Sequence, residues 1–483
     1  MNSREKERRD SEIPLSEFHD HHSSSIIAKG TKSDILVGAD GLPVGVFEEN
    51  VGEKKNKENE KLVEEQYVVE EEDKKEAPSK EPHYIHRLSA MLGLLNSLLG
   101  AGILGVPNSF INLGIIPSTL IMLLMIFLSE IGTIITIHLQ HVLNADGFPD
   151  IAHKLLGRPG ALALSILSLF FLMGCQLSYL VLGSDMIISF FAIGGIDMTT
   201  MWRRALLVFI YACIPISLSI PKDKPYLKFI SASTVIFILF FDVAMVIKGS
   251  IYIHDNHGIN PSVSYARIDI KLFSSLSIYA LAFSLPAVAL PVITQYNPNL
   301  HKRYFVTTLT LVSCFILVYI PGLFGYLEFG DQTKPNVTQN FADKDILIIV
   351  VRAAFILVVS FAYVSISQNT VISWSEIIFK DPNVNTIKTW KRAICLVCTN
   401  IIPLVIAMFL ANAKPALNIG GAMGGCMTNF FFPAILWIKN SDKKWYYWKN
   451  ILCILFAIFG VVAAVISTYQ AVLDAIDAFS NIK

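Results

Sequence analysis

Long apolar stretches separated by short polar segments dominate the chain from Leu88 onward. Each stretch runs for about twenty residues, the length that an α-helix needs to cross about 30 Å of hydrocarbon. A transmembrane β-barrel would show shorter segments of alternating polarity instead. The pattern predicts an all-α membrane protein with eleven transmembrane helices, whose approximate spans are 88–111, 115–137, 161–191, 205–220, 229–253, 272–294, 304–327, 345–372, 393–412, 415–438 and 450–473.

Residues 1–84 have a different character. They contain charge blocks such as Glu70-Glu71-Glu72-Asp73 and no sustained apolar period, so they bury too little surface to offset the entropy lost on ordering. Residues 1–86 hold 13 basic and 21 acidic residues, which gives this segment a net charge of −8. We therefore expect a disordered acidic cytosolic tail at 1–84, a transmembrane domain at 85–475 and a short luminal tail at 476–483.

Overall composition excludes several classes of protein. Hydrophobic residues make up 53% of the 483 residues and charged residues 16%, which argues against a soluble enzyme. The basic residues form no clustered surface of the kind that binds nucleic acid, so we expect no nucleic-acid partner. All seven cysteines lie within apolar stretches, which fits neither a secreted disulfide framework nor a zinc ribbon. We expect no cofactor and no metal.

The distribution of Lys and Arg predicts the orientation of the spans. If the tail is cytosolic, the cytosolic loops carry 15 Lys and Arg residues and the opposite side carries 10. Arg203 and Arg204 fall on the opposite side and are the main exception. The glycosylation sequon Asn336-Val337-Thr338 follows the seventh span, which places Asn336 on the luminal or outer side. We expect a cytosolic N-terminus and a luminal C-terminus.

Helix-breaking residues interrupt the first and sixth spans. The first contains Gly100, Gly102 and Pro107, and the sixth contains Pro286 and Pro291. Proline removes a backbone donor and glycine leaves helical geometry at little cost, so both spans should break near mid-membrane and leave N–H and C=O groups without helical partners. The alternative is that these residues are plain kinks or sites of close helix contact.

The positions of these two breaks favour a particular architecture. They correspond if spans one to five and six to ten are inverted repeats, with the eleventh span as an addition. Broken helices in corresponding halves are typical of secondary transporters that bind their substrate near the bilayer midplane. We therefore expect the two breaks to form a substrate site.

The first broken span also resembles a known family. Its sequence N-S-L-L-G-A-G-I-L-G-V-P, residues 96–107, in an eleven-span chain behind a long polar tail, is similar to the amino acid/auxin permease family, with the fungal vacuolar amino acid transporters closest. The resemblance implies a LeuT-type fold and, in the vacuolar branch, coupled movement of amino acids and protons. Sodium-coupled relatives place cation ligands at positions that match Asn96 and Ser360. The predicted luminal loops contain no cysteine for the loop disulfide of those relatives.

Groups freed at the two breaks are our candidates for substrate binding. The substrate carboxylate would meet N–H groups at the first break, namely those of Gly100, Ala101, Gly102 and Ile103. The substrate ammonium would meet carbonyls at the second break, namely those of Phe283, Ser284 and Leu285. Tyr179 would reach the carboxylate with its hydroxyl, and the Phe283 ring would cover the substrate. For both aromatic residues a role in core packing is the alternative.

Other polar residues inside the spans are candidates for ion coupling. Asn96 either ligates a cation or makes an interhelical hydrogen bond, and Ser360 is alternatively a helix-packing residue. Glu130 and Asp242 are the deepest carboxylates, and either can carry a proton in one conformation. For both carboxylates we favour the alternative, which is structural pairing with a basic residue or a helix end.

These observations predict a monomeric, proton-coupled secondary transporter of amino acids in the vacuolar membrane. Two other functions stay open. One is a membrane-embedded amino-acid sensor that signals through the acidic tail, and the other is a sodium-coupled carrier of the plasma membrane. An intramembrane enzyme has no support, because the spans show no facing carboxylate pair, metal-ligand cluster or nucleophile with a base.

Overall fold

The chain forms two compact units, Met1–Pro82 and His83–Lys483. The computed structural model describes residues 84–198, 200–221, 227–267, 269–381, 388–410 and 413–480, together with two strands near the N-terminus. These strands, β1 (Asp34–Val37) and β2 (Pro43–Phe47), pair in antiparallel fashion and are an exception to the predicted disorder of the tail. The other residues of the tail lie outside the described part of the chain.

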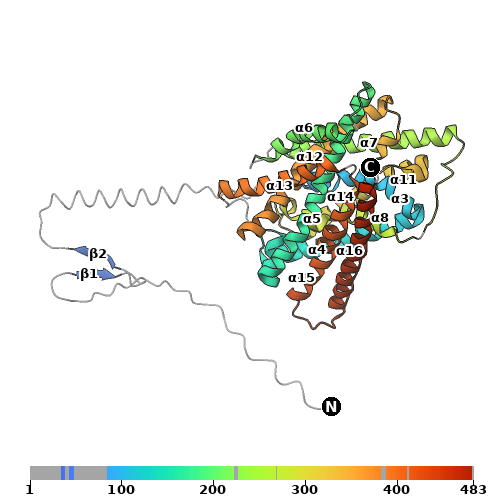
Figure 1. Ribbon diagram of the computed structural model, residues 1–483. Helices are drawn as coiled ribbons and strands as arrows, with labels where there is room; N and C mark the ends of the chain where they lie inside the picture. The colour runs from blue at the N-terminus through green and yellow to red at the C-terminus, as the bar shows by residue number, and fades with distance from the viewer. Residues whose placement is uncertain are drawn as a thin grey trace, which may run out of the picture. The chain divides into compact units, whose positions relative to one another are not determined.

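The second unit is a bundle of helices (Figure 1). In chain order, the helices are α2 (Arg87–Leu98), α3 (Ala101–Leu113), α4 (Ile115–Leu143), α5 (Phe148–Ile193), α6 (Met201–Ser219), α7 (Leu227–Asp255), α8 (Leu272–Ala282), α9 (Leu285–Val288), α10 (Leu290–Ile293), α11 (Leu300–Phe329), α12 (Ile346–Phe379), α13 (Thr389–Phe409), α14 (Lys414–Ile419), α15 (Phe432–Asn440) and α16 (Trp448–Ser480). Short 3-10 turns follow α11 at Gly330–Gln332 and Val337–Asn340, and π-helical turns join α14 to α15 at Gly420–Gly425 and Met427–Phe431.

The predicted number of membrane spans is confirmed. In the described part of the chain, ten segments are long and apolar enough to cross a bilayer, and the bent pair α2 and α3 brings the number to eleven. Helices α8 to α10 together form the sixth span, Leu272–Ile293. The chain is therefore a multi-pass, all-helical membrane protein beyond its tail.

The third span begins earlier than the sequence pattern indicates. Helix α5 starts at Phe148, whereas the apolar stretch starts at 161. Gly157, with φ of 71°, separates an amphipathic first segment from the apolar remainder. Left-handed backbone is accessible to glycine at little cost, so the chain changes direction there and resumes the helix at Pro159.

The two arginines that contradicted the orientation rule lie at the start of α6. Arg204 forms an ion pair with Asp185 of α5 at 2.9 Å. Arg203 donates to the carbonyl of Asp197 at 2.8 Å. Because the charge of Arg204 is neutralised within the protein, it is weak evidence about which side of the membrane this loop occupies.

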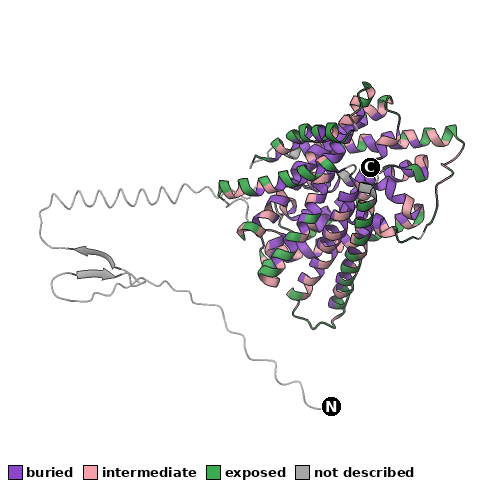
Figure 2. Ribbon diagram, viewed as in Figure 1, coloured by how far each residue is buried: buried purple, intermediate pink, exposed green. Residues whose placement is uncertain are grey.

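The sixth span lies at the centre of the bundle. Its most apolar window is 83% buried, against 28% for α13 and 39% for α16. The peripheral helices carry exposed residues along their length (Figure 2). Many of these exposed residues are large and apolar, such as Phe127, Phe209 and Leu455. In a membrane protein such side chains contact lipid, so the broken sixth span is shielded from lipid by the helices around it.

Candidate functional site

The first break separates α2 from α3. Helix α2 ends at Leu98, α3 begins at Ala101, and the two axes differ by 55°. Gly100 supplies no side chain to cap α3, so the first N–H groups of that helix lack a side-chain acceptor at the N-cap. The side chain of Ala101 is outside the described part of the chain. The predicted break therefore exists, and its position matches the glycine-rich motif.

Tyr179 of α5 packs directly against this break. A Cβ atom on Gly100 would lie 2.5 Å from Cε1 of the Tyr179 ring, and closer still to its hydroxyl oxygen. The tyrosine is 2% exposed, and its ring occupies the space that a side chain at position 100 would need. Tyr179 thus lies at the predicted site, with its hydroxyl end at the first break.

The second break lies between α8 and α9. Helix α8 ends at Ala282, Phe283 and Ser284 leave helical geometry, and α9 begins at Leu285. Pro286 stands in the first turn of α9, where its missing N–H removes a donor that would be unpaired in any case. Proline at this position ends α8 and starts a new helical segment within a single span.

The two breaks lie in contact. A Cβ atom on Gly102 would lie 3.4 Å from the Cβ of Ala282 and 3.8 Å from a side-chain carbon of Leu281. Gly102 stands in the first turn of α3 and Ala282 is the last residue of α8. The N-terminal end of one half-helix therefore meets the C-terminal end of another within the buried core.

The carbonyl groups of the second break already have hydrogen-bond partners. The Phe283 carbonyl accepts from Ser129 Oγ of α4 at 2.5 Å and from Leu285 N–H at 2.9 Å. The Ala282 carbonyl accepts from the Cys314 thiol at 3.8 Å. The expectation of an unpaired carbonyl at Phe283 is therefore wrong for this state, because the Ser129 hydroxyl donates a hydrogen bond to it. The sequence had not marked Ser129 as important.

Asn429 supports the same break from the π-helical segment after α14. It donates from Nδ2 to the Ala280 carbonyl at 3.0 Å and accepts at Oδ1 from Ser284 Oγ at 2.7 Å. The Ser284 side chain is thus held against the protein. A buried polar network of this kind fixes the geometry of the chain where the helix is interrupted.

Asn96 pairs across the bundle with a serine that the sequence did not single out. Its Nδ2 donates to Ser365 Oγ of α12 at 2.6 Å, while its Oδ1 is buried and has no hydrogen-bond partner in the described structure. Ser360 instead contacts the Tyr211 hydroxyl at 2.9 Å and donates to the Ile356 carbonyl at 2.6 Å. The hydroxyl opposite Asn96 is therefore that of Ser365, and not of Ser360 as the family resemblance implied.

The two candidate carboxylates are in different surroundings, since Asp242 is buried and Glu130 is half-buried. Glu130 Oε1 accepts from Thr308 at 2.6 Å and from Thr307 at 3.3 Å, both on α11, while its Oε2 has no hydrogen-bond partner within the described residues. Asp242 of α7 is 6% exposed, and its Oδ1 has no hydrogen-bond partner within the described residues. The sequence favoured structural pairing of these carboxylates, either with a basic residue or with a helix end. Within the described residues, neither Glu130 nor Asp242 forms an ion pair with a basic residue.

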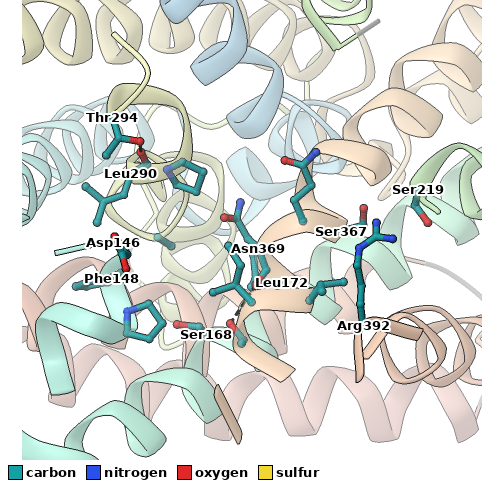
Figure 3. A pocket seen from close by; sticks show the side chains of 18 of the residues that line it. Asp146, Phe148, Ser168, Leu172, Ser219, Leu290, Thr294, Ser367, Asn369 and Arg392 are labelled. Carbon is teal, nitrogen blue, oxygen red and sulfur yellow. Dashed lines mark hydrogen bonds between the residues drawn. The ribbon is translucent and has the colours of Figure 1, made fainter. Parts of the chain in front are cut away.

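A cavity of about 410 Å³ lies at one end of the bundle. Figure 3 shows Asp146 and Arg392 on opposite sides of it, with Ser367 and Asn369 of α12 between them. Its lining also includes Leu172 of α5, and Ala287 of α9, which is three residues beyond Ser284 of the second break. The cavity therefore approaches the broken sixth span from one side.

This cavity is at the end of the bundle where α2 begins. The backbone N–H of Ile85, just before α2, donates to the carbonyl of the cavity-lining Gln295 at 3.0 Å. Connections between successive helices close the opposite end. There, Asn108 of α3 donates to the Thr333 carbonyl at 2.5 Å, and Arg267 forms an ion pair with Asp331 at 2.8 Å. The hydrogen bonds that Arg267 donates to the Asp331 carboxylate raise the pKa of its guanidinium, which therefore stays charged.

The side chain of the predicted glycosylation site is buried. Asn336 is 3% exposed, and its Oδ1 accepts from the backbone N–H and hydroxyl of Thr338 at 3.2 Å and 2.8 Å. Its Nδ2, the atom that would carry a glycan, is also buried. Attachment of a sugar would therefore require this turn to open, and glycosylation of Asn336 stays a prediction from the sequon.

Comparison with known proteins identifies the family. Residues 83–473 match the transmembrane amino acid transporter protein family. The chain belongs to this family. It is therefore an amino acid transporter of the membrane, and its family consists of transporters rather than enzymes.

Relatives of this transporter occur in animals and plants. It is 22% identical to zebrafish (Danio rerio) sodium-coupled neutral amino acid transporter 7, over 73% of this chain and 78% of the relative. It is 24% identical to amino acid transporter AVT6C of Arabidopsis thaliana, over 76% and 89%. It is 22% identical to a putative sodium-coupled neutral amino acid transporter 10 of Xenopus laevis, over 78% of this chain and 36% of the relative.

Proposed function

We propose that the transporter moves neutral amino acids across the vacuolar membrane, coupled to protons, by alternating access around the two breaks. The observation that carries this proposal is the contact between Gly102 and Ala282, which brings two interrupted helices together inside the core. Free helix ends at mid-membrane are suited to a zwitterion, because the N-terminal end attracts a carboxylate and the C-terminal end attracts an ammonium.

The substrate carboxylate meets the N–H groups of Gly100, Ala101, Gly102 and Ile103, beside the hydroxyl of Tyr179. The ammonium meets the carbonyl end of α8 by displacing the hydroxyl of Ser129 from the Phe283 carbonyl. The side chains named at the breaks carry no charge: Ile103, Leu281 and Leu285 are apolar, and the polar ones are hydroxyl and amide groups. This environment favours an uncharged substrate side chain, because a buried charge without a partner is costly.

Access to the site alternates between the two ends of the bundle. In the state described, the cavity at the α2 end supplies the path, and the hydrogen bonds of Asn108 and Arg267 close the other end. We assign the α2 end to the cytosol, with the acidic tail, and the other end and the C-terminus to the lumen. Rocking of the broken helices against the rest would open the closed end and release the substrate there.

Asp242 is our choice for the proton-carrying group. No donor in the described structure contacts its Oδ1, so nothing there stabilises a negative charge on that oxygen. Its helix, α7, packs against α2, α11 and α12, so a change in the charge of Asp242 acts on the first half of the broken first span. Glu130, which accepts from two threonine hydroxyls, is the second candidate.

A sodium-coupled carrier is the second candidate function. It is favoured by the unpaired Oδ1 of Asn96 next to Ser365, because oxygen ligands without other partners are suited to a hard cation. The names of two relatives also specify sodium coupling. In this alternative the ion binds at Asn96 and Ser365, and Asp242 has a structural role.

Uptake into vesicles that contain the purified full chain separates these proposals. Proton and sodium gradients are imposed separately, and uptake is measured for a panel of neutral, acidic and basic amino acids. We expect a proton gradient alone to drive accumulation of neutral amino acids. Accumulation driven by sodium alone would replace the proton proposal with the second candidate, and uptake of charged amino acids alone would contradict the proposed substrate class.

The location and the sensor hypothesis need a separate experiment. We expect the full chain, detected by microscopy in cells, to lie in the vacuolar membrane. We expect deletion of residues 1–83 to leave flux unchanged, since the breaks and the cavity are formed by residues 84 onward. A shortened chain with normal flux and lost signalling output would favour the sensor, and a chain found at the cell surface would contradict the vacuolar assignment.

A further inference from the structure

A second cavity lies beside the start of the first span, away from the breaks. Its volume is about 840 Å³, and it is formed where the chain enters α2 and where α10 connects to α11. The lining residues are Tyr84, Ile85, His86, Arg87, Ser89, Tyr296, Asn297, His301, Lys302 and Phe305. Arg87 and Ser89 lie in the first turn of α2, and none of the lining residues stands at either break, so substrate binding at the breaks does not account for this cavity.

The lining of this cavity is basic. Arg87, Lys302, His86 and His301 contribute side chains, and no acidic side chain is among the described lining residues. Neither Arg87 nor Lys302 forms an ion pair with an acidic residue of the described chain. Like charges gathered in this way repel each other unless a negative group joins them, so the cavity is electrostatically suited to an anion.

The helix ends at the cavity add to this positive potential. Arg87 is the first residue of α2, and His301 and Lys302 stand in the first turn of α11. Neither helix has an acidic residue in its first turn. Basic residues at the positive end of a helix dipole are unfavourable, and an anion bound there would relieve this.

Apolar and aromatic residues place the cavity at the edge of the membrane. Leu88 and Phe305 are both 56% exposed, and they flank the cavity on α2 and α11. Tyr84, which is exposed, lines the cavity together with the buried Tyr296, and exposed tyrosine is enriched where the bilayer meets water. The Arg87 guanidinium lies 5.8 Å from the centre of the Phe305 ring, which keeps a cation next to an apolar surface.

We propose that this cavity binds the phosphate headgroup of an anionic lipid, with the acyl chains lying along Leu88 and Phe305. Arg87 and Lys302 contact the phosphate, and the tyrosines lie at the level of the glycerol and ester groups. A lipid fits better than a dissolved phosphate because the same cavity borders exposed apolar side chains as well as cations.

Native mass spectrometry of the purified full chain tests this proposal. The chain is stripped of lipid and titrated with phosphatidylinositol phosphate, phosphatidylserine and phosphatidylcholine, and separately with the water-soluble headgroup of phosphatidylinositol phosphate and with inorganic phosphate. We expect one anionic lipid to bind preferentially. The double substitution Arg87→Ala with Lys302→Ala should weaken its binding about thirtyfold, because two cations that each contribute on the order of 1 kcal/mol together contribute about 2 kcal/mol.

Matched variants make the result specific. Lys439→Ala with Lys443→Ala removes the same charge at the same end of the bundle but outside the cavity, and we expect lipid binding to persist. Arg87→Lys with Lys302→Arg keeps the charge and should also keep binding, while the melting temperature of each variant reports on folding. The proposal is overturned if phosphatidylcholine binds equally well, if the soluble headgroup or phosphate binds as tightly as the lipid, or if both alanine pairs lose binding equally.

Discussion

The Tyr179 ring occupies the space that a side chain on Gly100 would require. This contact joins α5 to the interruption of the first span, and it explains why glycine stands at that point of the motif. The φ of Gly100 is −162°, outside the left-handed region that favours glycine. The requirement at position 100 is one of space.

Substitution Gly100→Ala tests this requirement. The new methyl group would lie 2.5 Å from Cε1 of Tyr179, so the ring or the break must move. We expect a loss of stability of about 1–3 kcal/mol, as for other overpacked cores, and a loss of amino acid uptake. The control is Gly105→Ala, whose methyl group would meet a Leu417 carbon at an ordinary 3.4 Å. Equal effects of the two substitutions on thermal unfolding would contradict the argument.

Ser129→Ala tests how the ammonium binds. The substitution removes the hydroxyl that occupies the Phe283 carbonyl, so the substrate no longer has to displace it. We expect a lower KM for uptake, by a few-fold, since a net hydrogen bond is worth about 1 kcal/mol. Thr133→Ala is the control, because the Thr133 hydroxyl donates to the carbonyl of Ser129 in its own helix. An unchanged KM in the Ser129 variant would remove the Phe283 carbonyl from the binding site.

Asp242→Asn tests the proton-carrying group. The amide of asparagine neither binds nor releases a proton at physiological pH, so a proton gradient should no longer drive accumulation of amino acids. Exchange of amino acids across the membrane should persist. Asp242→Glu should retain part of the accumulation. Glu130→Gln is the matched control, because Glu130 already has two hydroxyl donors. Loss of proton-driven accumulation in the Glu130 variant alone would transfer the assignment to Glu130.

The ion pair between Lys248 and Asp345 predicts a pH dependence of stability. Burial acts to raise the pKa of Asp345, but the Lys248 ammonium and the backbone N–H groups of Ile348 and Leu347 outweigh it and hold this pKa below its usual value. A lowered pKa means that the stabilisation is complete above the unfolded pKa of about 3.9 and is lost as the pH falls through the folded value.

Asp345→Asn measures this contribution. Asp345 also caps α12, and asparagine preserves the cap while removing the charge. We expect the variant to melt below the parent chain at pH 6 and the difference to vanish at pH values below the lowered pKa. An acidic compartment near pH 5 would leave the ion pair intact. A difference that grows as the pH falls would have the wrong sign and would contradict the pKa assignment.

The membrane spans and their interruptions could be predicted from the sequence because their causes are local. Span length follows from bilayer thickness, and the breaks follow from the glycine-rich motif at 96–107 and from Pro286, because glycine weakens a helix and proline ends one wherever they stand. The start of α5 at Phe148 was missed because its first segment is amphipathic and not apolar, so it gives no membrane signal. The two interruptions that form the site are thus consequences of residue type at single positions.

The partners of side chains across the bundle could not be predicted, because they depend on how each helix is rotated. Ser360 and Ser365 stand on the same helix, but five residues correspond to about 500° of rotation, so they point in directions about 140° apart. Only Ser365 faces Asn96. The contacts of Ser129 with Phe283 and of Asn429 with Ala280 were missed for the same reason, since each joins residues more than 140 positions apart.

The last prediction concerns Asn96 and its partner Ser365. It tests whether Ser365 or Ser360, the serine that the resemblance indicates, helps to bind a cation. Ser365→Ala removes the hydroxyl that accepts from Asn96 Nδ2, so the amide is free to turn and its unpaired Oδ1 loses its fixed direction. If a cation binds there, we expect the dependence of uptake on sodium concentration to shift to higher concentrations about tenfold. Ser360→Ala removes the contact with Tyr211 and should leave that dependence unchanged, at a similar small cost in stability. A larger shift of the sodium dependence in the Ser360 variant would assign the cation ligand to Ser360. If the sodium dependence is identical in both variants and in the parent chain, the interhelical hydrogen bond is the sole role of Asn96.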